Sequence, residues 1–159
     1  MKNKLLPIIG LAALVLAIAT IIFPVFPGIE RVAAGTTETF RAYDFVFGNS
    51  AIAYAKESNG AMIGAFILNI IALVFCLAGT IFVLADGTKK FGAFLLIVGG
   101  GSVLATGIIY ILAKSIIDFS YPATATFNLK FGFLGSGIAG IASGALGLFG
   151  GFLGMASKN

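Results

Sequence analysis

Residues 135–154 read GSGIAGIASGALGLFGGFLG and hold eight glycines in twenty positions. In a helix surrounded by water, each glycine costs about 1 kcal/mol relative to alanine. No charged residue and no proline interrupts the surrounding run 131–157, which is long enough to cross the ~30 Å hydrocarbon core of a bilayer as a helix. In lipid the backbone has no water to bond and stays helical. The run therefore predicts a membrane-spanning helix that is rich in glycine.

Six of these glycines are spaced 3, 4, 3, 4 and 3 residues apart, which places them along one stripe of a helix. A neighbouring helix can approach a stripe without side chains closely and gain dispersion contacts. We call this stripe the glycine seam and predict that it packs against another helix, whereas Gly150 falls off it. The alternative is that the spacing only reflects the abundance of glycine. The glycine seam consists of Gly137, Gly140, Gly144, Gly147, Gly151 and Gly154.

Three further runs, 5–26, 61–85 and 91–113, are also long enough to cross the bilayer and contain no charged residue. The whole chain is 59% hydrophobic and 10% charged, with a mean hydropathy of +1.09, whereas soluble domains are about 25% charged. We therefore predict an all-α membrane protein, an antiparallel four-helix transmembrane bundle that forms one domain over residues 1–159. The first run also carries the small-x-small pattern of a signal-peptide cleavage site at 17–19, but it continues beyond that site, which favours a retained helix.

Small residues also recur at helical spacing in the other three runs, so close packing of all four helices is expected. In the second run this stripe contains Asn69, the strongly polar side chain that lies deepest in any run. We expect its amide to form a hydrogen bond between helices, worth about 0.6–2 kcal/mol, that specifies their register. A pore-lining role for Asn69 is the alternative. The three stripes are Gly10, Ala13, Ala17 and Thr20; Ala61, Ala65, Asn69, Ala72, Cys76 and Gly79; and Gly99, Ser102, Thr106 and Ala113.

The distribution of Lys and Arg predicts the orientation of the bundle. Five of these residues lie in the two termini and the short loop 86–90, and the other five lie in the longer loops 27–60 and 114–130. The counts are equal, but the density of positive charge is higher in the short segments, which favours their placement in the cytoplasm. We therefore expect both termini in the cytoplasm and the longer loops outside, with the plasma membrane as the location.

The first outer loop contains a pattern that is typical of a strand. Aromatic residues alternate with others over 42–47, and the pair 48–49 places glycine where a hairpin turn needs positive φ. A return strand over 51–54 would complete a small hairpin. Alternatively, residues 51–57 begin the second long helix, with Ser50 as the N-cap.

In the second outer loop, the sequence predicts a turn over 120–122. A further strand is predicted within 123–129, which is rich in Thr and Phe. Aromatic side chains are frequent in both outer loops. They either anchor the protein at the headgroup level or form a contact surface for a neighbouring protein. The residues expected in such a contact surface are Phe40, Tyr43, Phe45, Phe47, Tyr121 and Phe127.

The composition argues against several classes of function. The chain has no histidine and a single cysteine, Cys76, and its four apolar runs contain no carboxylate, so we expect neither an enzyme nor a bound metal or cofactor. Despite the net charge of +4, the basic residues are scattered, which argues against a nucleic-acid partner. Ionisable residues within spans, which are typical of transport pathways, are also missing.

The layout of four spans with a longer first outer loop is similar to that of claudin-like and tetraspan proteins. The chain contains no Trp and no pair of cysteines, so the resemblance extends to topology alone. We expect a structural or assembly role in which the protein contacts membrane lipid and either its own copies, as a homo-oligomer, or a membrane-protein partner. The alternatives are an oligomeric pore or small-solute transporter, and an accessory subunit of a larger membrane complex.

Overall fold

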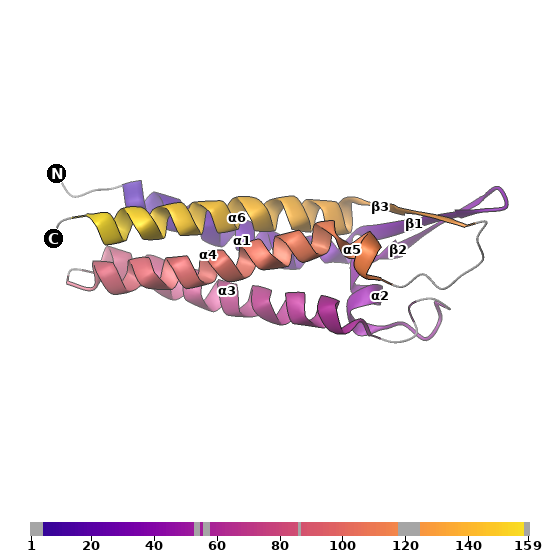
Figure 1. The fold of residues 1–159 in the computed structure, drawn as a ribbon, viewed down its shortest axis with the longest axis horizontal. Helices are drawn as coiled ribbons and strands as arrows, with labels where there is room; N and C mark the ends of the chain where they lie inside the picture. Colours follow the sequence, from indigo (N-terminus) through magenta and orange to yellow (C-terminus); the bar gives the residue numbers. More distant parts are fainter. Residues whose placement is uncertain (1–4, 53–54, 56–57, 86, 118–124, 158–159) are drawn as a thin grey trace.

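The structure, a computed structural model, describes residues 5–52, 55, 58–85, 87–117 and 125–157. Within these residues, four helices are long and apolar enough to cross a membrane, and they lie side by side (Figure 1). Each begins and ends within two residues of the run expected from the sequence. The four helices are α1 (Leu5–Ile22), which a 3₁₀ turn η1 (Phe23–Val25) extends, α3 (Gly60–Leu84), α4 (Lys89–Ile111) and α6 (Phe131–Ala156).

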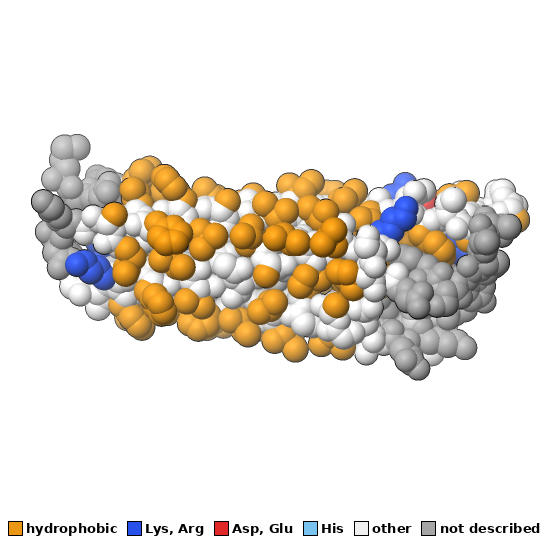
Figure 2. Space-filling model, in the orientation of Figure 1, with side chains coloured by type: hydrophobic (Ala, Val, Ile, Leu, Met, Phe, Trp, Pro, Cys, Tyr) orange, Lys and Arg blue, Asp and Glu red, His pale blue; other side chains and the backbone are white. Residues whose placement is uncertain are grey.

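The helices form an antiparallel bundle in which α1 contacts α3 and α6, and α4 contacts the same two helices from the other side. Large apolar side chains point away from the bundle, among them Ile8, Val74 and Phe152, each at least 60% exposed. On the face drawn in Figure 2, hydrophobic side chains extend along the helices, whereas Lys and Arg lie near the two ends. This distribution fits helices that are surrounded by lipid.

The glycine seam of α6 faces α4, and the two backbones are in contact. A Cβ atom added to Gly147 would lie 2.9 Å from Cα of Gly100, and one added to Gly140 would lie 2.9 Å from Cα of Gly107. One heptad beyond Gly100, Ala93 occupies the corresponding position on α4. All six glycines of the seam are buried. The matching seven-residue spacing of small residues on α4 is therefore what lets the two helices approach so closely.

Helix α6 uses a second face to contact α1. Gly150, which was expected to lie off the packing surface, is buried there, and a Cβ atom on it would lie 2.8 Å from Cγ2 of Ile9. On the same side, the Ser143 hydroxyl donates a hydrogen bond of 2.6 Å to the Ala13 carbonyl. Gly150 therefore has a packing role of its own, which a single stripe did not predict because α6 has two neighbours.

A small antiparallel sheet extends from one end of the bundle, which we call the sheet end (Figure 1). The sheet has the order β2-β1-β3, with β1 (Pro27–Ala33), β2 (Thr36–Arg41) and β3 (Thr126–Leu129). The hairpin between β1 and β2 turns at Ala34 and Gly35, both with positive φ, as a type I′ turn requires. The strand expected within 123–129 is confirmed over 126–129, whereas the turn expected at 120–122 lies outside the described residues.

The strand expected over 42–47 is wrong, because these residues form the helix α2 (Ala42–Phe47). The Arg41 amide donates to Oδ2 of Asp44 at 3.0 Å, which caps the helix, and positions 42, 45 and 46 turn inward. A run of six residues satisfies the helical and the strand periods equally well, so its pattern alone does not decide between them.

After residue 47, the structure shows neither the expected hairpin turn and return strand nor the expected early start of the second long helix in the residues that it describes. Gly48 has positive φ, but it ends α2 instead of starting a hairpin. Residues 51 and 52 belong to a turn, and α3 begins only at Gly60, where Asn59 is the N-cap. The expected strand over 51–54 and the expected helix start over 51–57 also include residues that lie outside the described part of the chain.

Replacement of Gly147 by alanine tests the backbone contact between α4 and α6. We expect Gly147→Ala to lower the free energy of unfolding by about 1–3 kcal/mol, because its methyl group collides with the backbone of Gly100. The matched control is Gly101→Ala on α4, where no atom lies within 4 Å of an added Cβ, and it should leave stability unchanged or slightly raised. Denaturant unfolding in mixed micelles measures both. Equal stability of the two variants would contradict the packing.

Candidate functional site

The sheet and α2 together form a cap on the sheet end of the bundle, which we call the sheet cap (residues 27–52 and 125–130). Its core contains Phe45, which is 2% exposed and lies against the ring of Phe133 at a centroid distance of 6.3 Å. Phe133 in turn lies 5.8 Å from the ring of Tyr110. This aromatic chain runs from α2 through α6 to α4, so the cap and the bundle share one core.

Close backbone approaches hold the sheet cap at a defined position on the helices. A Cβ atom on Gly132 would lie 2.5 Å from the Phe26 carbonyl oxygen, so only glycine fits at this point of α6. The Lys130 amide donates a hydrogen bond of 2.8 Å to the carbonyl of Gly28. The Tyr43 hydroxyl donates to the Ile21 carbonyl at the end of α1, and burial raises the pKa of Tyr43 above its usual value.

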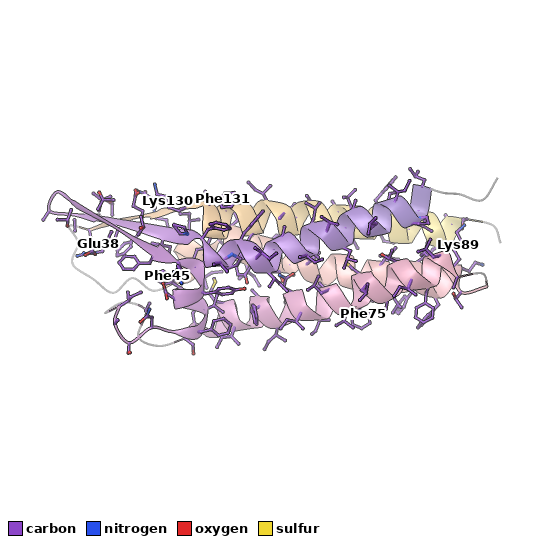
Figure 3. The ribbon with its side chains drawn as sticks, turned by 180° about the vertical axis from the view of Figure 1, so that it is seen from behind. Glu38, Phe45, Phe75, Lys89, Lys130 and Phe131 are labelled. Carbon is purple, nitrogen blue, oxygen red and sulfur yellow. The ribbon has the colours of Figure 1, made fainter. Side chains whose placement is uncertain are left out.

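One ion pair connects two strands of the cap, and a second connects the sheet to the start of α6. Arg31 and Glu38 face each other across β1 and β2, with 2.9 Å between Nη1 and Oε2. Glu30 on β1 lies 2.7 Å from Nζ of Lys130, and the hydrogen bond and charge of this lysine lower the pKa of Glu30. Figure 3 shows Glu38 on the projecting hairpin and Lys130 at the start of α6. The Glu30–Lys130 pair therefore ties the sheet to the bundle as well.

The aromatic residues expected to form a contact surface occupy several different environments. Phe45 and Phe127 are buried in the core, at 2% and 8% exposure, and offer almost no surface for a contact. Phe40 and Tyr43 are half-buried and pack against the same core. Tyr121 lies outside the described residues. The strand pattern over 42–47 predicts that Tyr43, Phe45 and Phe47 share one face, but the helix α2 turns Phe45 toward the bundle.

Of this group Phe47 is exposed, and its position fits the anchoring alternative. It is 54% exposed, and its ring lies 5.5 Å from that of Tyr43 and 5.1 Å from that of Phe66 on α3. Exposed Phe26 and Phe131 form a second pair near the junction of η1 and α6, with ring centroids 5.8 Å apart. Aromatic rings at the ends of spanning helices are typical of the headgroup level of a bilayer.

The outer edge of β2 is the feature of the cap that points to an intermolecular contact. Within the described residues, β2 pairs with β1 alone, and Thr36, Thr37, Glu38 and Thr39 are all exposed. This strand does not follow from the alternation of apolar residues, because the Thr-rich run 36–41 lacks the pattern that identifies a half-buried strand. Its high content of β-branched Thr was the available signal.

Asn69 does not make the hydrogen bond expected between helices. Its side chain is fully buried, yet neither its amide nitrogen nor its oxygen bonds to any described residue. Hydroxyl groups form such bonds instead: Thr106 donates to the Ala65 carbonyl at 3.0 Å, and Ser143 donates to Ala13. The described residues also contain no group of His, Cys, Asp and Glu that could hold a metal ion.

Comparison of the chain with protein-family models and with curated proteins gives no match. The interpretation of the sheet cap therefore rests on its own geometry.

Substitutions of two phenylalanines on α2 test whether the cap and bundle share a core. We expect Phe45→Ala to lower the free energy of unfolding by about 3–5 kcal/mol, because it opens a cavity between the cap and α6. Phe47→Ala removes the same side chain from an exposed position and should cost no more than about 1.5 kcal/mol. Thermal or denaturant unfolding in nanodiscs measures both. A Phe45→Ala protein as stable as the Phe47→Ala protein would show that the cap does not pack on the bundle.

Proposed function

We propose that this protein is an integral membrane protein with a structural or assembly role, and that it contacts a second copy of itself or a membrane-protein partner through the outer edge of β2. The observation that carries the proposal is the exposed, unpaired edge of this strand within the described residues. The four apolar helices would hold the protein in the membrane, and the sheet cap would present the strand.

The chemistry of β2 supports the addition of another strand. An unpaired edge offers a row of backbone N–H and C=O groups, and many proteins protect such an edge with lysine, proline or a bulge. Here the exposed residues 36–39 are three threonines and Glu38, whose charge is paired with Arg31. Threonine favours extended backbone and adds little repulsion.

The fixed position of the cap adds a second argument. Because Gly132, Lys130 and the aromatic core hold the cap on the helices, copies in one membrane would present β2 at the same height. The strands β2 and β3 both run antiparallel to β1, toward the bundle. Two copies related by an axis along the membrane normal would therefore pair their β2 strands in parallel.

Disulfide or bismaleimide crosslinking in native membranes tests the contact. In a Cys76→Ala background, which removes the single native cysteine, we expect Thr37→Cys on β2 to give a crosslinked dimer. Ser50→Cys, which is also an exposed position and lies in the connection after α2, is the matched control and should not crosslink. A larger adduct with another protein would support a heterologous partner and the accessory-subunit alternative. A Thr37→Cys protein that remains monomeric at native density would refute the contact.

We further propose that the protein lies in the plasma membrane with both termini in the cytoplasm, as the positive charge at Lys89 and Lys90 supports. In intact cells, a membrane-impermeant maleimide should label Thr37→Cys. It should label Ala85→Cys, an exposed position at the opposite end of the bundle, only after permeabilisation. The reverse pattern of labelling would invert the orientation.

A further inference from the structure

Asn69 is the least satisfied polar side chain in the described part of the helices. It is fully buried, and both Nδ2 and Oδ1 lack a hydrogen-bond partner there. Buried polar groups in proteins are nearly always paired with protein atoms or ordered water, because an unpaired group loses its hydration without compensation. An amide that retains two donors and an acceptor therefore points to a ligand that can both donate and accept.

The register of the helices places two hydroxyl groups at the level of this amide, and the first belongs to Thr20 on α1. A Cβ atom added to Gly10 on α1 would lie 2.7 Å from Oγ1 of Thr80 on α3. About two turns further toward the sheet end, Ala17 and Ala72 belong to one buried cluster. Since α1 and α3 are antiparallel, one more turn in that direction brings the fully buried Thr20 level with Asn69.

Helix α4 contributes the second hydroxyl group. Thr106 donates to the carbonyl of Ala65, one turn from Asn69 on α3, and Val103 shares a buried cluster with Ala72, one turn from Asn69 on the other side. Asn69 therefore lies between these two contacts with α4. Three helices each supply one buried polar side chain to this level, which we call the polar layer: Thr20, Asn69 and Thr106.

The two hydroxyl groups use their protons elsewhere and keep acceptor capacity. Thr20 donates to the Leu16 carbonyl at 3.0 Å, and Thr106 donates to the Ala65 carbonyl at 3.0 Å. Each oxygen retains a lone pair. One turn beyond Thr106, the buried hydroxyl of Tyr110 also lacks a partner among the described residues, and side chains on α4 lean back toward Thr106.

We propose that the polar layer binds an ordered water molecule inside the bundle. The water oxygen accepts from the Asn69 amide nitrogen, and its protons go to Oδ1 of Asn69 or to a hydroxyl oxygen of the layer. A cation fits less well, because the four helices carry no carboxylate and the amide hydrogens of Asn69 would repel it. A small neutral ligand that donates and accepts satisfies every unpaired atom of Asn69.

NMR spectroscopy of the full-length, ¹⁵N-labelled protein in nanodiscs tests the proposal. The chain contains six asparagines and no glutamine, so the side-chain amide region holds few signals, and Asn69→Leu identifies the Asn69 pair by its loss. We expect direct NOE cross-peaks between these amide protons and water, with the sign of a bound molecule in NOESY and ROESY spectra. The exposed amide of Asn128 serves as the control for exchange with bulk water. If Asn69→Leu does not fold, the unaltered protein is labelled with ¹³C as well as ¹⁵N, and correlation of the side-chain amide to the Cβ of Asn69 assigns the signals.

Two matched threonine variants locate the water. Thr106→Val retains the shape of the side chain but removes an acceptor of the layer, and it should weaken or abolish the Asn69–water cross-peaks. Thr80→Val removes a buried hydroxyl that lies near Gly10, far along α3 from the layer, and it should leave them unchanged. Cross-peaks from Asn69 to hydroxyl protons without any to water would overturn the proposal in favour of a direct bond. A shift of the Asn69 signals with sodium or potassium concentration would overturn it in favour of a cation.

Discussion

The contact between the backbones of α4 and α6 is the constraint on which the rest of the structure depends. Gly140 and Gly147 meet Gly107 and Gly100 at distances that leave no room for a methyl group. In lipid, association of helices gains little from the hydrophobic effect and relies on dispersion and on weak hydrogen bonds. Small residues along the facing sides of both helices increase these interactions, because they let the two backbones come within van der Waals distance over the length of the span.

The sheet cap follows from the same use of glycine. Gly132 lets the start of α6 touch the carbonyl of Phe26, so the strand that follows η1 begins directly on the bundle. The aromatic core then joins α2 to α4 and α6. A cap that shares its core with the spanning helices cannot move freely over them. The outer edge of β2 is therefore presented in a defined direction, which is what an assembly role through this edge needs.

Some features of the fold were predictable and others were not, for identifiable reasons. The four spans follow from length and hydropathy, because lipid excludes charge from a helix regardless of its neighbours. Residues 42–47 form a helix and not the expected strand. A run of six residues fits the helical and the strand periodicity alike, and the hydrogen bond from the Arg41 amide to Asp44 that starts the helix depends on local geometry. Phe45 and Phe127 were expected at the surface, because the sequence does not indicate that the cap and the bundle share one core. The packing role of Gly150 was not predicted, because the glycine seam describes the contact of α6 with one neighbour, α4, whereas Gly150 lies against α1.

From the sequence alone came the number and extent of the apolar helices, the small residues along their faces, and the strand over 126–129. These features depend on local composition and periodicity. Only the tertiary structure decided that the glycine seam meets Gly100 and Gly107, that β1 lies between β2 and β3, and that Thr106 on α4 bonds to Ala65, one turn from Asn69. Such pairings depend on the register between segments far apart in the chain, and register is set by the packing of whole surfaces, which no single segment encodes.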